Sequence, residues 1–286
     1  MRAVEVVSPG PSALVQDLGR PGHAHLGVPP SGALDVPALR LANRLVGNPE
    51  AAAGIEALFG GLTLKARASC TIAVTGPSVP VTVDGRDVGS HLPVHLRTGQ
   101  TVALGSPATG LRCYLAVSGG IDVDVELGSR SRDVLSEIGP APLAAGDVLP
   151  LGKPCGLPAG ADVLTPSPCP AELEVPVLLG PRDDWFEDPA ARLAGPWTVT
   201  SDSNRVGVRL DGTPLLRTAE FSDVELPSEG LVTGAIQAPP SGLPVVFLAD
   251  HPTTGGYPVI GVVRRAALPA LAQARPGTSV WFRPSR

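Results

Sequence analysis

Glycine and proline interrupt this chain so often that long regular elements have no room to form. The 286 residues include 34 glycines and 33 prolines, and these fall between short apolar segments rather than in one low-complexity block. Proline removes a backbone donor and glycine favours turns, so this pattern is typical of many short strands joined by tight turns. We therefore predict a mainly β protein with a few short helices.

The overall composition limits what such a protein can do. Hydrophobic residues make up 43% and charged residues 17%, which is enough apolar surface for a buried core and too much for a disordered chain. The net charge is −5 and no Lys/Arg run exceeds two residues, which argues against a nucleic-acid partner. We find neither an apolar run of the roughly 18 residues that span a bilayer nor a signal-peptide core. We expect a cytoplasmic protein without a membrane partner.

The first half of the chain predicts two helices and several strands. Asp35 can cap a helix that carries Pro37 in its first turn, and Gly47 ends it. A second helix is predicted over residues 50–58. The predicted strands are residues 71–75, 79–83, 100–104 and 112–117, with a turn at Asp84-Gly85 after the second. We expect these strands to form one antiparallel sheet or a small barrel.

The second half repeats this style after a break. Residues 151–170 hold five prolines and three glycines and are predicted to be a linker between domains at 1–150 and 171–286. Helices are expected near residues 183–193 and 267–274. The predicted strands are residues 175–179, 197–200, 206–210, 230–237, 245–249 and 280–282. The tetrapeptide Pro-Pro-Ser-Gly occurs in both halves and favours two related β domains.

Several common catalytic motifs are missing from the sequence. It contains no GxxxxGK[ST] phosphate loop, no strand-linked GxGxxG, no GxSxG elbow and no HExxH helix. The four cysteines form no CxxC pair, so we expect free thiols. His23 and His25 lie two apart without a nearby cysteine or acidic cluster, and we predict no metal site.

Four polar segments could carry chemistry. Residues 16–22, Gln-Asp-Leu-Gly-Arg-Pro-Gly, combine an amide, a carboxylate and a guanidinium with glycine N–H groups that could meet a small anion. In residues 203–210, Arg205 and Arg209 would project from one face of a strand and clamp a carboxylate or phosphate. Residues 228–242 offer a glutamate and the Gln237 amide. Residues 250–258 place Asp250 at a strand end before a Gly-rich loop, where it could act as a general base or orient an amide. Residues 16–22 could equally be a solvated turn, and Arg205 and Arg209 could equally be two surface arginines.

These segments, taken together and in order, resemble a known family. The matching stretches are QDLGRPG (16–22), GVPPSGALD (27–35), VSGGI (117–121), LGSRS (127–131), NRVGVRL (204–210), GAIQAP (234–239) and TGGYP (254–258). They are similar to the proteins called the C subunit of 5-oxoprolinase, KipA or allophanate hydrolase subunit 2. The resemblance runs almost from end to end. One departure is His251-Pro252, where the family usually has Arg-Gln.

The resemblance implies two cyclophilin-like β-barrel domains and a partner protein of the B-subunit or KipI type. It also implies kinship with the carboxyltransferase half of urea carboxylase, whose biotin is borne on a Met-Lys-Met carrier. The sole methionine here is Met1, so biotin would have to come on another chain.

Our leading hypothesis is a subunit of an ATP-dependent 5-oxoprolinase that opens the lactam of 5-oxo-L-proline to L-glutamate. ATP with Mg²⁺ would act in the complex, and the partners would be the KipI-type B subunit plus a lactam-hydrolase-like A subunit. The alternatives are a carboxyltransferase component acting on urea or a related amide, and a KipA-like regulatory binding protein. The expected catalytic residues are Asp17, Gln237, Asp250 and Tyr257. The expected residues for binding substrate or phosphate are Arg20, Ser31, Gly119, Gly120, Arg205, Arg209, Thr254, Gly255 and Gly256.

Overall fold

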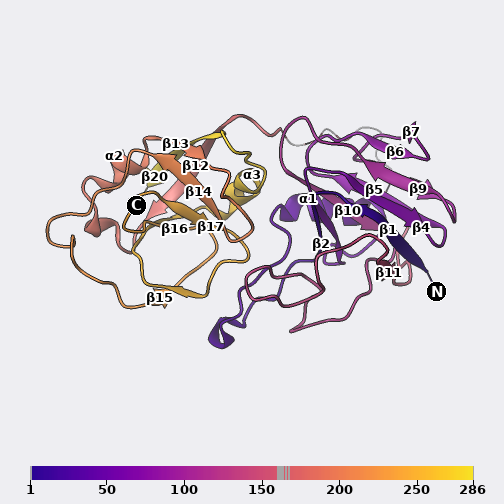
Figure 1. The fold of residues 1–286 in the computed structure, drawn as a ribbon, viewed down its shortest axis with the longest axis horizontal. Helices are drawn as coiled ribbons and strands as arrows, with labels where there is room; N and C mark the ends of the chain where they lie inside the picture. The colour runs from indigo at the N-terminus through magenta and orange to yellow at the C-terminus, as the bar shows by residue number, and fades with distance from the viewer. Residues whose placement is uncertain (1, 160–163, 165, 167, 286) are drawn as a thin grey trace. The chain divides into compact units, whose positions relative to one another are not determined.

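The structure is a computed structural model that describes residues 2–159, 164, 166 and 168–285. Strands dominate the described residues, as Figure 1 shows, which confirms the mainly β prediction. The α-helices are short: α1 (Val36–Leu45), α2 (Pro189–Leu193) and α3 (Leu268–Ala272). No helix in these ranges is both long and apolar enough to cross a membrane.

The chain divides into two compact units. Unit 1 consists of Met1–Arg20, Ser31–Asp133 and Glu137–Cys169, and unit 2 consists of Pro21–Pro30, Val134–Ser136 and Pro170–Arg286. Two short segments from the first half of the sequence therefore belong to unit 2. The predicted linker at 151–170 precedes the main part of unit 2, but its residues 160–163, 165 and 167 lie outside the described residues.

Unit 1 contains two antiparallel sheets. The first has the strand order β11 (Val148–Pro150), β1 (Ala3–Pro9), β4 (Leu62–Ala66), β9 (Thr101–Leu104), β6 (Val81–Val83) and β7 (Arg86–Asp87). The second has the order β2 (Ser12–Gln16), β3 (Gly54–Leu58), β10 (Arg112–Val117), β5 (Cys70–Thr75) and β8 (Val94–Leu96). The expectation of one sheet is wrong, because β9 pairs with β4 and β6 in the first sheet, whereas β10 pairs with β3 and β5 in the second.

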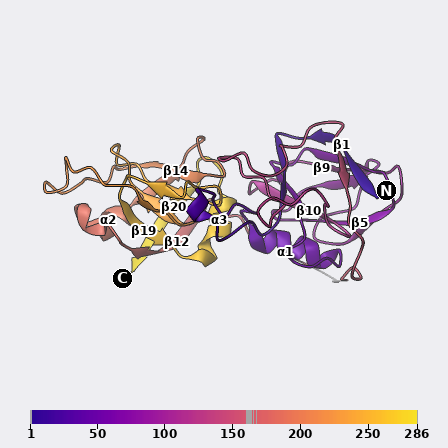
Figure 2. The same cartoon turned by 90° about the horizontal axis from the view of Figure 1, so that it is seen from below.

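Helix α1 covers one face of the second sheet. Asp35 caps it as predicted, since its Oδ1 accepts a hydrogen bond of 3.1 Å from the Ala38 N–H. The helix contacts β10 and β5, and the three labels lie together in Figure 2. Strand β10 is consequently buried along its whole length, because α1 lies on one face and the core on the other.

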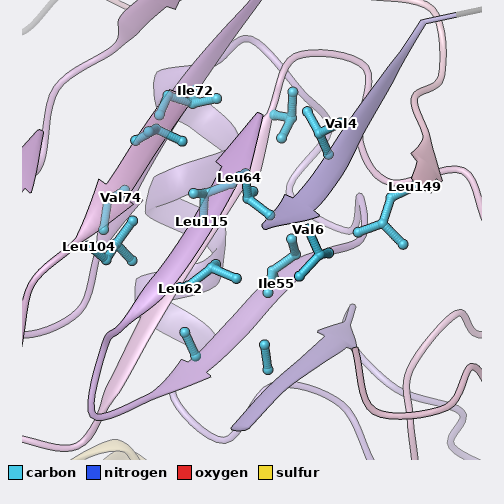
Figure 3. Packing of buried hydrophobic residues seen from close by; sticks show 14 of the residues in the cluster. Val4, Val6, Ile55, Leu62, Leu64, Ile72, Val74, Leu104, Leu115 and Leu149 are labelled. Atoms are coloured by element: carbon cyan, nitrogen blue, oxygen red, sulfur yellow. The ribbon is translucent and has the colours of Figure 1, made fainter. Parts of the chain in front are cut away.

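The core of unit 1 lies between the two sheets. The side chains labelled in Figure 3 come from strands of both sheets, among them Val4 and Leu64 from the first and Ile55 and Leu115 from the second. Strand β4 alternates buried and more exposed residues, as expected for a strand with one face in the core. Burying an aliphatic side chain of this kind contributes about 1.5–3 kcal/mol.

Unit 2 is built around a closed barrel. Its strands follow the order β12 (Glu172–Leu179), β19 (Val259–Val263), β16 (Ala235–Gln237), β17 (Val245–Phe247), β14 (Gly207–Gly212), β13 (Pro196–Val199) and β20 (Ser279–Ser285). A parallel pairing of β12 with β20 closes it. A separate two-stranded sheet joins β15 (Glu229–Gly230) and β18 (Thr254–Gly255).

Two helix predictions need correction. Residues 54–58 form strand β3 and not a helix, because this strand pairs with β2 on one side and β10 on the other. Those tertiary pairings outweigh the helix propensity of Ala57 and of the alanines at 51–53. Residues 183–193 contain a 3₁₀ turn (Asp183–Trp185) and then α2, because Pro189 lacks an N–H donor and keeps Asp188 out of a helical conformation. The turn at Asp84-Gly85 is confirmed, with positive φ angles of 49° and 78°.

The cysteine thiols give a first testable prediction. No disulfide joins any of the four cysteines, all of which lie in the described ranges; Cys70 and Cys113 are buried and Cys155 is exposed. Burial raises the pKa of Cys70 from 9.0 to about 11, so its thiol stays protonated at pH 8. We expect Cys155 to be alkylated within minutes at pH 8 and Cys70 and Cys113 to be alkylated only after unfolding, as mass spectrometry of labelled peptides would show.

The same shift makes a prediction about pH. In the unfolded state the Cys70 thiol ionises near pH 9, whereas in the folded state its pKa is about 11. The unfolded state therefore loses this proton first, and the free energy of unfolding should fall as the pH rises from 9 to about 11. A Cys70→Ala variant should remove this slope, because the titrating thiol is gone. Rapid alkylation of Cys70 in the native protein would contradict the assignment of Cys70 as a buried, protonated thiol.

Candidate functional site

Asp17, directly after β2, is the centre of a dense hydrogen-bond network in unit 1. One carboxylate oxygen accepts from the hydroxyls of Ser129 (2.5 Å) and Ser131 (2.6 Å) and from the Gly19 N–H (2.8 Å). The other oxygen accepts from the Arg130 N–H at 2.7 Å. The carboxylate is thus held by four donors and ties the loop after β2 to residues 129–131.

Arg20 lies at the end of the same loop with 2% of its surface exposed. Its Nε donates to the carbonyl of Glu126 at 3.3 Å, and its Nη2 donates to the carbonyl of Ser131. Its Nη1 is buried and has no hydrogen-bond partner among the described residues. Both partners of Arg20 are neutral carbonyl oxygens, so the contacts fix the guanidinium without neutralising it.

Ser31 and Gly32 lie against this loop. A Cβ on Gly32 would come within 2.7 Å of the Gly19 nitrogen, and the Ala33 N–H donates to the Asp17 carbonyl at 2.9 Å. Ser31 has a φ of 52°, in the left-handed region that a serine rarely adopts. Its hydroxyl is buried and has no partner in the described part of the chain.

A buried polar network supports the segment that follows Ser31. Glu56 on β3 accepts from the Tyr114 hydroxyl at 2.7 Å and from the Leu34 N–H at 3.2 Å, while the Asp35 N–H donates to the Tyr114 oxygen at 2.8 Å. Arg112 lies 3.6 Å from Glu56 as an ion pair. Burial first, and then the Glu56 charge, raises the pKa of Tyr114 well above its usual value, so the hydroxyl remains a donor.

Gly119 and Gly120 form a tight turn after β10. The N–H of Gly119 donates to the Asn48 side chain at 2.7 Å, and the N–H of Gly120 donates to the Val117 carbonyl at 2.8 Å. A Cβ on Gly119 would come within 2.2 Å of the Gly152 oxygen. The two N–H groups are already used within the fold, so this turn does not supply the free donors that the sequence suggested for a phosphate.

In unit 2, Arg205 and Asp250 pair with each other. Arg205 Nε and Nη2 donate to the two oxygens of Asp250 at 2.8 and 3.0 Å, and Asp250 is fully buried. The Val134 N–H also donates to Asp250, at 3.1 Å. Arg209 is exposed on β14, whereas Arg205 precedes that strand and is buried. The two arginines therefore lie in different surroundings and do not form the clamp expected from their spacing.

The remaining predicted residues lie near the end of β16 in unit 2. Gln237 donates from Nε2 to the Tyr257 carbonyl at 3.1 Å, and a Cβ on Gly255 would come within 2.7 Å of the same nitrogen. Thr254 and the Tyr257 ring are exposed, and Gly256 is partly buried. The Gln237 amide thus positions the turn after β18.

His251 stands where the resembled family usually has arginine. The imidazole is buried, donates from Nδ1 to the Pro252 carbonyl at 2.7 Å and lies 6.1 Å from the Phe247 ring between centroids. In the described residues, no group of three or more His, Cys, Asp or Glu side chains could hold a metal ion. The His23 and His25 rings lie 6.5 Å apart.

The structure thus brings most of the predicted residues into three groups, and it leaves Gly119, Gly120 and Arg209 outside them. Asp17, Arg20 and Ser31 lie together on adjoining segments of unit 1. Arg205 and Asp250 form an ion pair in unit 2, and Gln237 lies with the turn after β18. Ser129, Ser131, Glu56 and Tyr114 are not among the residues predicted from the sequence. The signal for the last two is a pair of polar residues inside otherwise apolar runs, which is typical of a buried network.

Comparison with known proteins assigns the chain to a family. The family profile described as "Carboxyltransferase domain, subdomain A and B" matches residues 26–284. The chain is 37% identical to the C subunit of 5-oxoprolinase from Escherichia coli K12, covering 98% of this chain and 90% of that protein. It is 33% identical to the urea amidolyase of Saccharomyces cerevisiae over 99% of this chain but 16% of the yeast protein.

Solved structures show the same relationship. A structure of TTHA0988 matches with a TM-score of 0.88 and 37% identity over 99% of this chain, which spans 55% of that longer chain. The urea carboxylase of Kluyveromyces lactis matches with a TM-score of 0.91 and 31% identity, over 99% of this chain and 27% of that one. The matching profile and the full-length relatives agree, and the chain belongs to the carboxyltransferase domain family, subdomains A and B.

Proposed function

We propose that this chain is one subunit of an ATP-dependent 5-oxoprolinase, which opens the lactam of 5-oxo-L-proline to L-glutamate together with partner subunits. The observation that carries the proposal is the similarity to the C subunit of 5-oxoprolinase from Escherichia coli over nearly the whole length of both proteins. A second protein of that name, from Haemophilus influenzae, is 33% identical over 98% of this chain and 90% of its own length.

The chemistry of lactam opening indicates which part of the reaction this chain could serve. A lactam carbonyl is stabilised by resonance, and transfer of the ATP γ-phosphoryl group to its oxygen makes the ring carbon electrophilic enough for water. Mg-ATP carries several negative charges and needs several cationic or N–H donors. The site around Arg20 offers one buried guanidinium, which does not fit a triphosphate. We therefore place ATP on a partner protein and give this chain a role in holding the substrate.

Within that role, the residues differ in whether their side chains still have unused hydrogen-bond donors or acceptors. Arg20 Nη1 and the Ser31 hydroxyl have unused hydrogen-bonding capacity and could touch the substrate. The Asp17 and Asp250 carboxylates are held by neighbouring donors, so we treat both as positioning residues rather than as general bases. The exposed guanidinium of Arg209 and the Thr254 side chain are open to a partner or a ligand.

A second candidate function is carboxyl transfer to urea or a related amide. The family profile and the TM-score of 0.91 against a urea carboxylase favour it. These 286 residues contain no methionine after Met1 and hence no Met-Lys-Met sequence, so biotin would have to be carried outside them. The two candidates therefore differ in what they require: a lactam-hydrolase-like protein or a biotinylated carrier.

We expect the isolated chain to be inactive and to bind a partner of the B-subunit or KipI type. Co-purification of the tagged chain from its native host, followed by mass spectrometry, identifies the partner. The recovered complex should release glutamate and phosphate from 5-oxoproline only when ATP is present. Release of glutamate by the isolated chain would contradict this role as one part of a complex.

The same complex separates the candidate functions. ATP-dependent formation of glutamate supports the 5-oxoprolinase, whereas incorporation of labelled bicarbonate into urea, dependent on a biotinylated chain, supports carboxyl transfer. A complex that does neither while binding its partner tightly would favour the regulatory alternative.

A further inference from the structure

Arg20 is a buried cation whose charge is not balanced by any carboxylate of the described residues. Its side chain is 2% exposed, and its hydrogen bonds go to the carbonyls of Glu126 and Ser131. Within the described ranges, no carboxylate oxygen lies within the 4.0 Å of an ion pair with it. Buried arginines are almost always paired, because removing a lone charge from water is unfavourable. The guanidinium is therefore suited to binding an anion.

The free edge of Arg20 is held rigidly. Nε and Nη2 are fixed by two carbonyls, and the Ser131 that supplies one of them is itself bound to Asp17 through its hydroxyl and through the Asp17 N–H. Nη1, whose N–H groups are unused, is thereby fixed in place. A donor fixed in this way loses little entropy when a ligand binds, so it favours binding.

Ser31 supplies a second unused group on the adjoining segment. Its left-handed backbone is held in place by the close packing of Gly32 on Gly19. Further along, the N–H groups of residues 34 and 35 donate hydrogen bonds to Glu56 and Tyr114. A strained residue is kept only where the surrounding structure determines it, and such residues gather at binding sites. The hydroxyl can donate one hydrogen bond and accept others.

We propose that Arg20 and Ser31 form a subsite for a singly charged carboxylate, with Nη1 and the Ser31 hydroxyl donating to its oxygens. One guanidinium balances one negative charge, whereas a phosphate dianion would leave an excess of negative charge buried. This assignment rests on the proposed function, since 5-oxoproline carries one carboxylate, on the carbon next to the ring nitrogen. The subsite would hold that group while the lactam bond reacts elsewhere.

The test compares 5-oxoproline with pyrrolidin-2-one, which is the same lactam without the carboxylate. Ser31→Ala and Arg20→Lys are made in the assembled complex, with Ser69→Ala and Arg97→Lys as controls outside the candidate site in unit 1. We expect the KM for 5-oxoproline to rise about tenfold in Ser31→Ala and more in Arg20→Lys, with smaller changes in kcat. Because pyrrolidin-2-one has no carboxylate, Ser31→Ala should raise its KM by a much smaller factor than it raises the KM for 5-oxoproline.

Binding without ATP gives a readout that does not depend on turnover. By calorimetry the wild-type complex should bind 5-oxoproline at least tenfold more tightly than pyrrolidin-2-one, inorganic phosphate should not compete, and Ser31→Ala should remove most of the difference. Competition by phosphate, or equal binding of the two lactams, would overturn the subsite. Unchanged binding of 5-oxoproline in both variants would also overturn it, because Arg20 and Ser31 would then contact only water. A complex that binds 5-oxoproline in this way but does not hydrolyse it would refute the proposed function and leave the subsite standing. Circular dichroism of Arg20→Lys checks its folding, and Ser31→Ala carries the test if that variant does not fold.

Discussion

Replacing Asp250 with asparagine should lower the free energy of unfolding by about 3–5 kcal/mol, the usual loss when one partner of a buried ion pair is removed. The change is small in volume, but it leaves the Arg205 guanidinium buried opposite a neutral amide. One amide oxygen can still accept a hydrogen bond, whereas the new NH₂ group faces an N–H donor. Urea unfolding followed by circular dichroism measures the difference.

A matched control separates charge removal in general from loss of this pair. Asp202 is exposed in the same unit, and Asp202→Asn should change stability by less than about 0.5 kcal/mol. A double variant that replaces Arg205 with methionine and Asp250 with leucine should recover part of the loss, because no unpaired charge remains. Asp250→Asn with wild-type stability but greatly reduced turnover would instead make Asp250 a catalytic group.

This prediction differs from the one that the sequence favoured, and the reason is physical. A carboxylate at a strand end before a Gly-rich loop is a good position for a general base, and Arg205 is a good residue for binding an anion. The sequence gives no indication that the two meet each other, since they are 45 residues apart and their contact depends on how the barrel strands are ordered. Only the fold shows that both side chains are already used.

The features that the sequence did predict are those with local causes. Asp35 caps α1 through a contact three residues away, and Asp84-Gly85 form a hairpin turn through their own φ angles. Strand β3 shows the opposite case, because Ala57 and the alanines at 51–53 just before the strand favour a helix, whereas its pairing with β2 and β10 decides the outcome. Propensity predicts an element well only where no distant strand competes for its backbone.

In the candidate site, too, distant contacts decide what the sequence alone does not predict. Motif and chemistry agree on Asp17, Arg20 and Ser31, but the different roles of these residues depend on contacts that the sequence does not reveal. Asp17 meets Ser129 across 112 residues of chain and is fully engaged, whereas Arg20 and Ser31 retain free groups. The Asp17 carboxylate thus holds the site together, whereas Arg20 and Ser31 carry the groups that can bind a ligand.

Asp17→Asn is the change that tests this division, and we expect it to lower the free energy of unfolding by about 2–4 kcal/mol. If the amide oxygen takes the place of the oxygen that accepts from Gly19, Ser129 and Ser131, those three bonds lose the strength that the charge gave them. The amide NH₂ then faces the Arg130 N–H, so a donor meets a donor and one hydrogen bond is lost.

The functional effect of Asp17→Asn should follow from Arg20. Loosening of Ser131 releases the carbonyl that fixes the guanidinium, so the KM for 5-oxoproline should rise, and the rise should be close to that of Arg20→Lys rather than additive with it. Asp124→Asn, at an exposed position of unit 1, is the control and should change neither stability nor KM. If Asp17→Asn instead keeps wild-type stability and KM while kcat falls 100-fold or more, the carboxylate acts on the reacting amide itself, because a positioning residue that had lost its contacts could not leave both stability and substrate binding unchanged.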